Sequence, residues 1–566
     1  MKAFTEPLLS LAGFEEMTKT AEKSSGLISV TGCIDAQKSQ MIYAFGGHRK
    51  NKLIVTFGEQ KAKELYDEYS FFDKEVVYYP SKDVLFYQSD IRGNLLTAER
   101  IRALKAIREQ ERVTLVTTFD ALMNTMAPIE KMWENVLTLE QGQLLDLKEI
   151  QAALIRMGYE KEYQVQTMGQ FSVRGGILDV FPLTEENPIR IELWGDEIDT
   201  IRYFDCESQK SIENIDRVSI YPAAELVLSD EEKAGGIDKL KAEAKRVSDK
   251  LRKQMKTEEA HRVTVMADEL TEEWGELSMY AGMDAFLSYF FDERVGLLDY
   301  FKPSDSLIFF DELTRCTEQG KLTETEFSES MKQRLAMGYI LPGQMNGLFT
   351  EKEIVAKLGK YSCIALAALD NKANGLHQLG SYGIHCQSVS PYNNSFELLI
   401  KDLKRYKKNG YRVILLSGSR TRAKRLSEDI TDQGITCFYT ENYDHELFEG
   451  QIMVCYGKVR RGFEYPILKF AVITESDIFG AQQKKKKRHR TYEGEKIQSF
   501  TDLSVGDYVV HENHGLGIYR GIEKLEVDKK VKDYIKIEYQ GGSNLYILAT
   551  QLDMIQKYAG KDARKP

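Results

Sequence analysis

Strand and helix patterns alternate along the first part of the chain, and this alternation constrains the fold more than any other feature. Segments between the strands, such as 97–111, have the apolar spacing of helices. Strands that alternate with helices pack as a parallel sheet covered by helices. The segment 1–140 is therefore predicted to be the first part of an α/β domain. Its buried strands are predicted at 27–30, 53–57, 76–79 and 113–117.

The pattern changes at 141–222, where short strand-like runs are separated by Gly and Pro. Such a pattern predicts a small α+β insert with an antiparallel sheet. A long charged helix is then predicted at 238–256, and buried strands return at 306–310 and 363–367. We therefore expect 223–372 to complete the first α/β domain around the insert.

The rest of the chain divides into two further domains. Residues 373–393 are predicted to be a linker and 394–480 a second α/β domain that serves as a spacer. This domain starts with a helix from 395 to 408 that ends at Gly410. The fold class is thus α/β and multidomain. Closely spaced glycines and short strand patterns in 498–566 predict a small closed β-barrel of the Tudor or SH3-like kind.

Charge and cysteine content limit the compartment and the partners. The net charge of -10 leaves attraction to nucleic acid only to local basic patches. No stretch approaches the ~18 consecutive apolar residues of a membrane span, and the N-terminus lacks a signal-peptide pattern. The seven cysteines include no C-x-x-C pair, which favours a reducing compartment. We expect a cytoplasmic protein with no membrane partner.

Two stretches resemble a known family. Residues 168–211, MGQFSVRGGILDVFPLTEENPIRIELWGDEIDTIRYFDCESQKS, are similar to a module shared by the excision-repair protein UvrB and the transcription-repair coupling factors. Residues 505–525, VGDYVVHENHGLGIYRGIEKL, resemble the RNA-polymerase-interacting domain that coupling factors share with CarD-type regulators. UvrB lacks the second stretch and CarD-type proteins lack the first. Together, and in this order, they resemble the bacterial transcription-repair coupling factors.

The resemblance implies two docking partners, UvrA and the RNA polymerase β subunit. For UvrA it favours the insert, with candidate residues Arg156, Arg174, Phe181, Arg190 and Arg202. An alternative is that the arginines pair with Glu192, Asp196 or Glu197 inside the domain. In that alternative the apolar residues are core, namely Phe171, Val173, Phe181 and Trp194. For the polymerase it favours the barrel, with candidates Tyr519, Ile522, Lys524 and Leu525, of which Leu525 has barrel core as its alternative role.

The resemblance also implies a missing part. In the family a RecG-like motor that moves on double-stranded DNA follows the barrel and uses ATP and Mg²⁺. This sequence stops at Pro566, so we expect an adaptor part without that motor. The UvrB-like region 1–372, called the front region below, would be a motor remnant with a degenerate RecA-like sheet.

A phosphate-binding loop is only partly present. Gly32, Lys38 and Ser39 have the required spacing, and Asp311 with Glu312 ends a later strand like a Mg²⁺-binding acidic pair. However, Gln37 replaces the Gly before the Lys, and Asp35 places a carboxylate where phosphate would bind. We predict a degenerate nucleotide site, no catalytic residue and no cofactor on this chain.

Two other functions stay open, a UvrB-like ATP-dependent helicase and a stand-alone CarD-like transcription regulator. The segment 481–497 is predicted to be a solvated basic linker or a phosphate-contacting arm. Its cations are Lys484, Lys485, Lys486, Lys487, Arg488 and Arg490. His511 and His514 share no face and lack further ligands, so no metal site is expected.

Overall fold

The computed structural model describes most of the chain. The described residues are 1–45, 49–82, 94–206, 208–276, 283–369, 375–480, 494–496, 503–511, 515–527, 530–538, 544–548 and 555–558. Among them no helix is long and apolar enough to cross a membrane.

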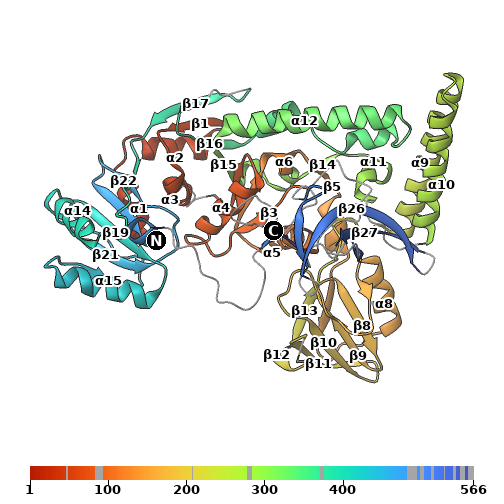
Figure 1. Ribbon diagram of the computed structural model, residues 1–566, viewed down its shortest axis with the longest axis horizontal. Helices are drawn as coiled ribbons and strands as arrows, with labels where there is room; N and C mark the ends of the chain where they lie inside the picture. The colour runs from red at the N-terminus through yellow and green to blue at the C-terminus, as the bar shows by residue number, and fades with distance from the viewer. Residues whose placement is uncertain are drawn as a thin grey trace.

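A seven-stranded parallel sheet is the centre of the front region (Figure 1). Its strands, in spatial order, are β17 (Gln378–Gly383), β1 (Gly26–Thr31), β16 (Ser362–Leu366), β15 (Ser306–Asp311), β2 (Asn51–Thr56), β4 (Val113–Thr118) and β3 (Val77–Tyr79). The late strands β15 and β16 lie between β1 and β2, so the strands predicted at 306–310 and 363–367 join the same sheet as those of the first segment. Every residue of β4, β15 and β16 is buried, as expected of strands covered on both faces.

Successive residues of these strands enter two different cores. On one face, Leu53, Ile308 and Cys363 pack with α5 (Asn94–Glu109) and α12 (Leu313–Ala336). On the other, Ile54, Phe309 and Ile364 pack with α3 (Asp35–Phe45) and α4 (Glu59–Tyr69). The period of two along a strand therefore assigns each side chain to its core.

The second α/β domain has a six-stranded mixed sheet. Its order is β18 (Gln387–Ser388), β22 (Phe463–Tyr465), β23 (Phe470–Thr474), β19 (Arg412–Ser417), β21 (Ile452–Tyr456) and β20 (Phe438–Tyr439). One face packs on α14 (Phe396–Lys408) and α15 (Arg420–Asp432). The opposite face shares a continuous apolar core with the first domain.

The segment 373–393 is more ordered than a linker. Its residues 378–383 form β17, which pairs in parallel with β1, and 387–388 form β18, which pairs with β22. The prediction of a plain linker is wrong because this segment adds an edge strand to each of two sheets.

The insert has a six-stranded sheet of its own. The order is β12 (Ser211–Ile215), β11 (Glu197–Phe204), β10 (Ile189–Trp194), β9 (Ile177–Val180), β8 (Gln170–Arg174) and β7 (Glu160–Lys161). One face packs on α8 (Leu147–Arg156), and no helix among the described residues of the insert covers the other (Figure 1). At its base β6 (Leu137–Glu140) pairs antiparallel with β13 (Arg217–Ile220).

Buried charge attaches the end of the insert to α5. Arg100 is fully buried, stacks on the Tyr79 ring at 4.0 Å and donates to Glu225, with 2.7 Å between Nε and Oε1. Lys82 lies 3.0 Å from the same carboxylate. Burial opposes ionisation of Glu225, but the charges of Arg100 and Lys82 outweigh it and lower the pKa of Glu225 to about 2.

A long helical hairpin follows the insert. It comprises α9 (Asp230–Lys253) and α10 (Thr257–Glu276), and it starts eight residues before the predicted helix at 238. Ser229 and Glu232 form a capping box that begins α9. Gly236 lies inside the helix because any Cβ there would meet the Phe290 ring at 2.2 Å.

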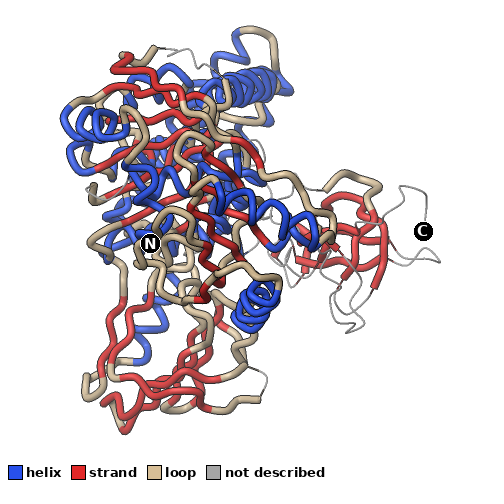
Figure 2. The backbone as a smooth tube through the Cα atoms, turned by 90° about the vertical axis from the view of Figure 1, so that its left-hand side faces the viewer, coloured by secondary structure: helices blue, strands red, loops and turns tan. Residues whose placement is uncertain are grey.

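The C-terminal strands form one antiparallel sheet that stands apart from the other layers (Figure 2). The order is β24 (Gly494–Lys496), β29 (Ile555–Tyr558), β25 (Tyr508–His511), β26 (Gly515–Val527), β27 (Lys530–Glu538) and β28 (Asn544–Leu548). Within the described residues β24 and β28 are not paired, so closure into a barrel stays a prediction.

Replacing Glu225 tests the attachment of the insert. Glu225→Gln leaves Arg100 without its buried partner, and we expect a loss of about 3–5 kcal/mol in urea unfolding at pH 7. Because the folded pKa of Glu225 is lowered, the loss is full above the unfolded pKa of about 4.3 and shrinks as the pH falls towards 2.

Glu185→Gln is the matched control. Glu185 pairs with the partly exposed Lys105 at 3.3 Å, so its loss costs about 0–1 kcal/mol. Equal losses for the two variants would contradict the anchoring role of Glu225.

Candidate docking surfaces and a buried ion cluster

The polar face of the insert sheet brings together the predicted arginines. Arg190 lies directly opposite Asp179 on β9 and Arg202 on β11. Arg174 on β8 reaches the same Asp179 with Nη2 to Oδ2 at 2.8 Å. Because side chains alternate between faces, the adjacent Val173, Ile189 and Ile201 enter the core with α8.

Asp179 is shared by two arginines. Its buried carboxylate accepts from Arg190 Nε at 2.7 Å and Arg190 Nη2 at 2.8 Å, besides the bond from Arg174. One carboxylate cannot neutralise two guanidinium groups, so one positive charge remains on this face. The side chain of Arg190 is 13% exposed and that of Arg174 is 35% exposed. Arg174 is therefore the arginine of this pair that a partner can reach.

Arg202 and Phe181 have more internal roles. Arg202 forms a two-pronged ion pair with Glu192, with Nη1 to Oε2 at 3.0 Å. Phe181 is 8% exposed, so it offers a partner little surface, and its burial favours the alternative role in the core. Arg156 is exposed near the end of α8. The sequence predicts Glu192 as a partner of the arginines, and Arg202 pairs with it. It does not predict Asp179, which Arg174 and Arg190 share.

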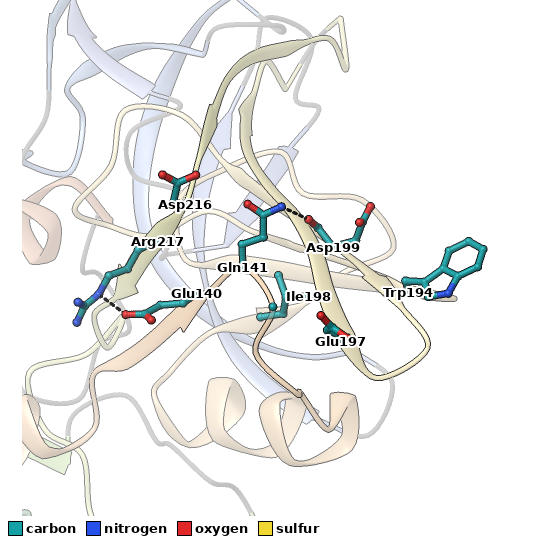
Figure 3. A pocket seen from close by; sticks show the side chains of 9 residues that line it. Glu140, Gln141, Trp194, Glu197, Ile198, Asp199, Asp216 and Arg217 are labelled. Carbon is teal, nitrogen blue, oxygen red and sulfur yellow. Dashed lines mark hydrogen bonds and ion pairs between the residues drawn. The ribbon is translucent and has the colours of Figure 1, made fainter.

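Trp194 does not belong to the core. It ends β10 and is 85% exposed, which corrects the expectation that it is buried. Trp194 lines an open cavity of about 660 Å³, and Figure 3 shows its ring pointing away from the other lining side chains. That cavity is lined by Glu140, Glu197, Asp199 and Asp216, with Arg217 as its cation. Its acidic character distinguishes it from the arginine-bearing face.

In the C-terminal sheet, the second half of β26 has a free edge. Residues 515–518 pair with β25, whereas 521–527 pair only with β27 among the described residues. Ile522 is half-buried, and Lys524 and Leu525 lie on the free edge segment. Tyr519 is fully buried in the core of this sheet, so its predicted contact with a partner is wrong.

The degenerate nucleotide site is occupied by the chain itself. Lys38 is buried, and its Nζ lies 2.5 Å from Asp311, 3.0 Å from Glu312 and 3.1 Å from Asp35. Burial opposes the charge on Lys38, but these carboxylates outweigh it and raise the pKa of Lys38. The predicted lysine and acidic pair do meet, as an internal ion cluster.

The loop that would enclose a phosphate is closed by backbone contacts. The N–H groups of Gly32 and Cys33 donate to the carbonyls of Ala368 and Ala367 at 3.2 and 3.0 Å. Gly32 has φ +76°, and a Cβ there would lie 2.0 Å from the carbonyl oxygen of Ile384. Ser39 is buried on α3. Ala367, Ala368 and Ile384 therefore take the space and the donors that a phosphate loop offers.

A small cavity remains beside this cluster, between α3, α4 and the turn at Arg460. Its volume of about 260 Å³ is below the 300–1,000 Å³ typical of ligand sites. Ion pairs cross it, from Lys61 to Asp35 at 2.8 Å and from Arg460 to Glu64 at 2.7 Å. Burial raises the pKa of Glu68 at its wall to about 7.

The basic run at Lys484–Arg490 lies outside the described residues. The same holds for His514, whereas His511 ends β25.

Replacing Lys38 separates a structural lysine from a nucleotide-binding one. Lys38→Met leaves Asp311 and Glu312 uncompensated, and we expect a loss of about 3–5 kcal/mol in urea unfolding without nucleotide. Lys61→Met, at a more exposed pair, should cost about 0–1 kcal/mol. Unchanged stability of Lys38→Met together with lost ATP binding would instead favour a functional nucleotide site.

Comparisons with known proteins agree with both domains. Residues 137–226 match the UvrB interaction domain, and residues 503–559 match the CarD-like/TRCF RID domain. The first match includes β6 and β13, whereas the predicted boundary at 141 excluded β6.

Similarity to full-length proteins extends over nearly the whole chain. The transcription-repair-coupling factor of Bacillus subtilis strain 168 is 30% identical over 516 residues, which is 91% of this chain and 43% of that protein. The coupling factor of Staphylococcus haemolyticus is 29% identical over 95% of this chain and 46% of its own length. That of Staphylococcus aureus strain MRSA252 is 28% identical over 98% and 47%.

The chain thus spans a little under half the length of the curated relatives that it matches. It matches these transcription-repair-coupling factors over a part that contains a UvrB interaction domain followed by a CarD-like/TRCF RID domain, and the predicted resemblance to this family is confirmed.

Proposed function

We propose that this chain is an adaptor in transcription-coupled nucleotide-excision repair. It binds stalled RNA polymerase through the C-terminal sheet and recruits UvrA through the insert. The presence of both domains in one chain carries this proposal, because each family match implies one of the two partners. In this proposal the adaptor part and the motor part of the family's proteins are distinct. The motor part acts on double-stranded DNA and uses ATP to displace the polymerase.

UvrA docking is assigned to the helix-free face of the insert sheet. The shared Asp179 leaves one uncompensated positive charge there, and Arg174 is accessible. Arginine offers a planar fork that suits carboxylates, and arginine and tryptophan are enriched among residues that dominate interface energies. Arg190 acts as a positioning residue, because its pairing with Asp179 and its stacking on the Phe204 ring at 4.4 Å orient the neighbouring Arg174.

Polymerase docking is assigned to the free edge of β26. An exposed strand edge presents unpaired backbone donors and acceptors, and a strand of the β subunit can add to it. In strand addition the backbone bonds supply affinity and alternate side chains supply specificity. The segment 521–527, which includes Leu525, has this open edge within the described residues.

The front region serves as a frame and not as a catalyst. Lys38 is engaged by three carboxylates, and the amides of Gly32 and Cys33 are engaged by carbonyls. A nucleotide would have to break all of these contacts to bind. The proposed adaptor therefore needs no ATP, Mg²⁺ or other cofactor on this part of the protein.

Removing the accessible arginine should weaken UvrA binding. We expect Arg174→Ala to lose about 1–3 kcal/mol of affinity for purified UvrA, measured by calorimetry. Arg217→Ala is the matched control. Arg217 is 64% exposed but lies on β13, which pairs with β6 at the base of the insert and not on the proposed docking face. Equal affinities of the two variants would place the UvrA surface elsewhere.

A charge on the free strand edge should abolish polymerase binding. We expect Leu525→Arg to lose the β subunit in a pull-down with the whole chain, because an arginine there must be desolvated against an apolar contact. Leu525→Met preserves the apolar contact and should bind normally. Normal capture by Leu525→Arg would reject this edge as the polymerase site.

A further inference from the structure

The tip of the α9–α10 hairpin is a basic projection on an acidic chain. The two helices lie side by side and extend past the sheets at the edge of the molecule (Figure 1). Segment 245–259 contains six cations, Lys245, Arg246, Lys250, Arg252, Lys253 and Lys256, against the three acids Asp249, Glu258 and Glu259. The whole chain, by contrast, has a net charge of -10.

One stripe of this tip consists of cations alone. Arg246, Lys250 and Lys253 have the spacing i, i+4 and i+7, which puts them on one face of α9. All three are exposed, and none forms an ion pair within the described part of the chain. Asp249 lies within one turn of Lys245, Arg246, Arg252 and Lys253, so a single carboxylate faces the five cations of 245–253.

Helix capping explains only part of this charge. Cations in a last turn interact favourably with the carbonyl end of a helix, which accounts for Lys250, Arg252 and Lys253. Arg246 lies about two turns before the end of α9, beyond the reach of that effect. The stripe thus extends about 10 Å along the helix, a distance that covers about three phosphates of one DNA strand.

Met255 at the apex is a second, independent feature. It follows α9 in a Schellman turn, in which Lys256 N donates to Leu251 O and Met255 N donates to Arg252 O, both at 3.0 Å. Its φ of +61° is a conformation that Gly or Asn usually supplies at this position. Even so, the residue is Met, and it is 88% exposed. An apolar side chain is thus presented to the surroundings from a strained backbone.

The tip is also fixed in direction. Arg262 on α10 stacks over the Tyr339 ring at 4.5 Å and donates to the Met337 carbonyl at the end of α12 at 2.5 Å. The hairpin is therefore braced against the first domain close to its apex.

We infer that this tip is a binding site for double-stranded DNA. Arg246, Lys250 and Lys253 contact backbone phosphates, and Met255 enters the groove beside them, where methionine is among the apolar residues that proteins insert. A helical tip is too narrow for the ~800 Å² per partner of a stable protein interface, whereas phosphate contacts depend on charge. The site is separate from both proposed docking surfaces and does not rest on them.

The test compares charge removal at two matched helical stripes. The whole chain, the triple variant Arg246→Gln, Lys250→Gln and Lys253→Gln, and a control triple variant are titrated onto a labelled 30-base-pair duplex at several KCl concentrations. The control, Lys401→Gln, Lys404→Gln and Lys408→Gln, removes three exposed cations along α14. The basic run at 484–490 is the same in all three proteins.

We expect the tip variant to lose on the order of tenfold or more in affinity, and its salt dependence, d log K/d log[KCl], to become shallower by about 2.7, at about 0.9 per phosphate. The control should bind as the unmodified chain does. Equal losses in both variants, or unchanged binding by the tip variant, would overturn the inference. So would unchanged DNA binding together with lost binding of UvrA or RNA polymerase, since the tip would then be a protein-docking site.

Met255→Gly tests the apex without changing charge. We expect weaker DNA binding with an unchanged salt slope and no fall in melting temperature, because glycine adopts a positive φ without strain. An unchanged affinity for the duplex would show that Met255 does not contact DNA. A lowered melting temperature would show that Met255 supports the fold instead of contacting a ligand.

Discussion

The ion cluster around Lys38 joins parts of the chain that are far apart in sequence. Lys38 follows the first strand, whereas Asp311 and Glu312 end and follow a strand that the chain adds after both the insert and the hairpin. A buried charge requires its partners, so this contact forms only when β15 is in place beside β16 and β2. The strained Glu312, with φ +60°, also accepts from Ala368 N at 3.1 Å and so ties the following segment to the same cluster.

The same frame explains how two projections leave the first domain without disturbing it. The insert departs after β4 and returns through β13, where Glu225 and Tyr221 contact Arg100 and Glu109 on α5. The hairpin departs next and returns before β15. Both are attached by buried or braced contacts, so their exposed faces have defined directions relative to the sheet.

The second α/β domain packs directly on the first. Its sheet shares one apolar cluster with the first domain, and Tyr465 lies 3.2 and 3.3 Å from Gln37 and Gln40 on α3. Packed in this way, the second α/β domain has a fixed position against the first. The cavity beside Arg460 lies at this junction, where opposite charges face one another across the two domains.

Local sequence patterns determined the elements, the cores and the family. Continuous apolar runs such as 307–310 specify strands buried on both faces, and alternation such as Val173 between Ser172 and Arg174 specifies a sheet with one polar face. Ser395 and Gly410 predicted the limits of α14 because capping depends on adjacent residues.

Pairings between distant segments were decided only by the tertiary structure. Asp179 as the shared partner of two arginines depends on the register of β9 against β8 and β10, and the edge strand β17 depends on contact with β1. Trp194 and Tyr519 have similar aromatic character in the sequence, yet one is exposed and the other buried. Burial depends on which neighbouring element covers a residue, and the residue type alone does not contain that information.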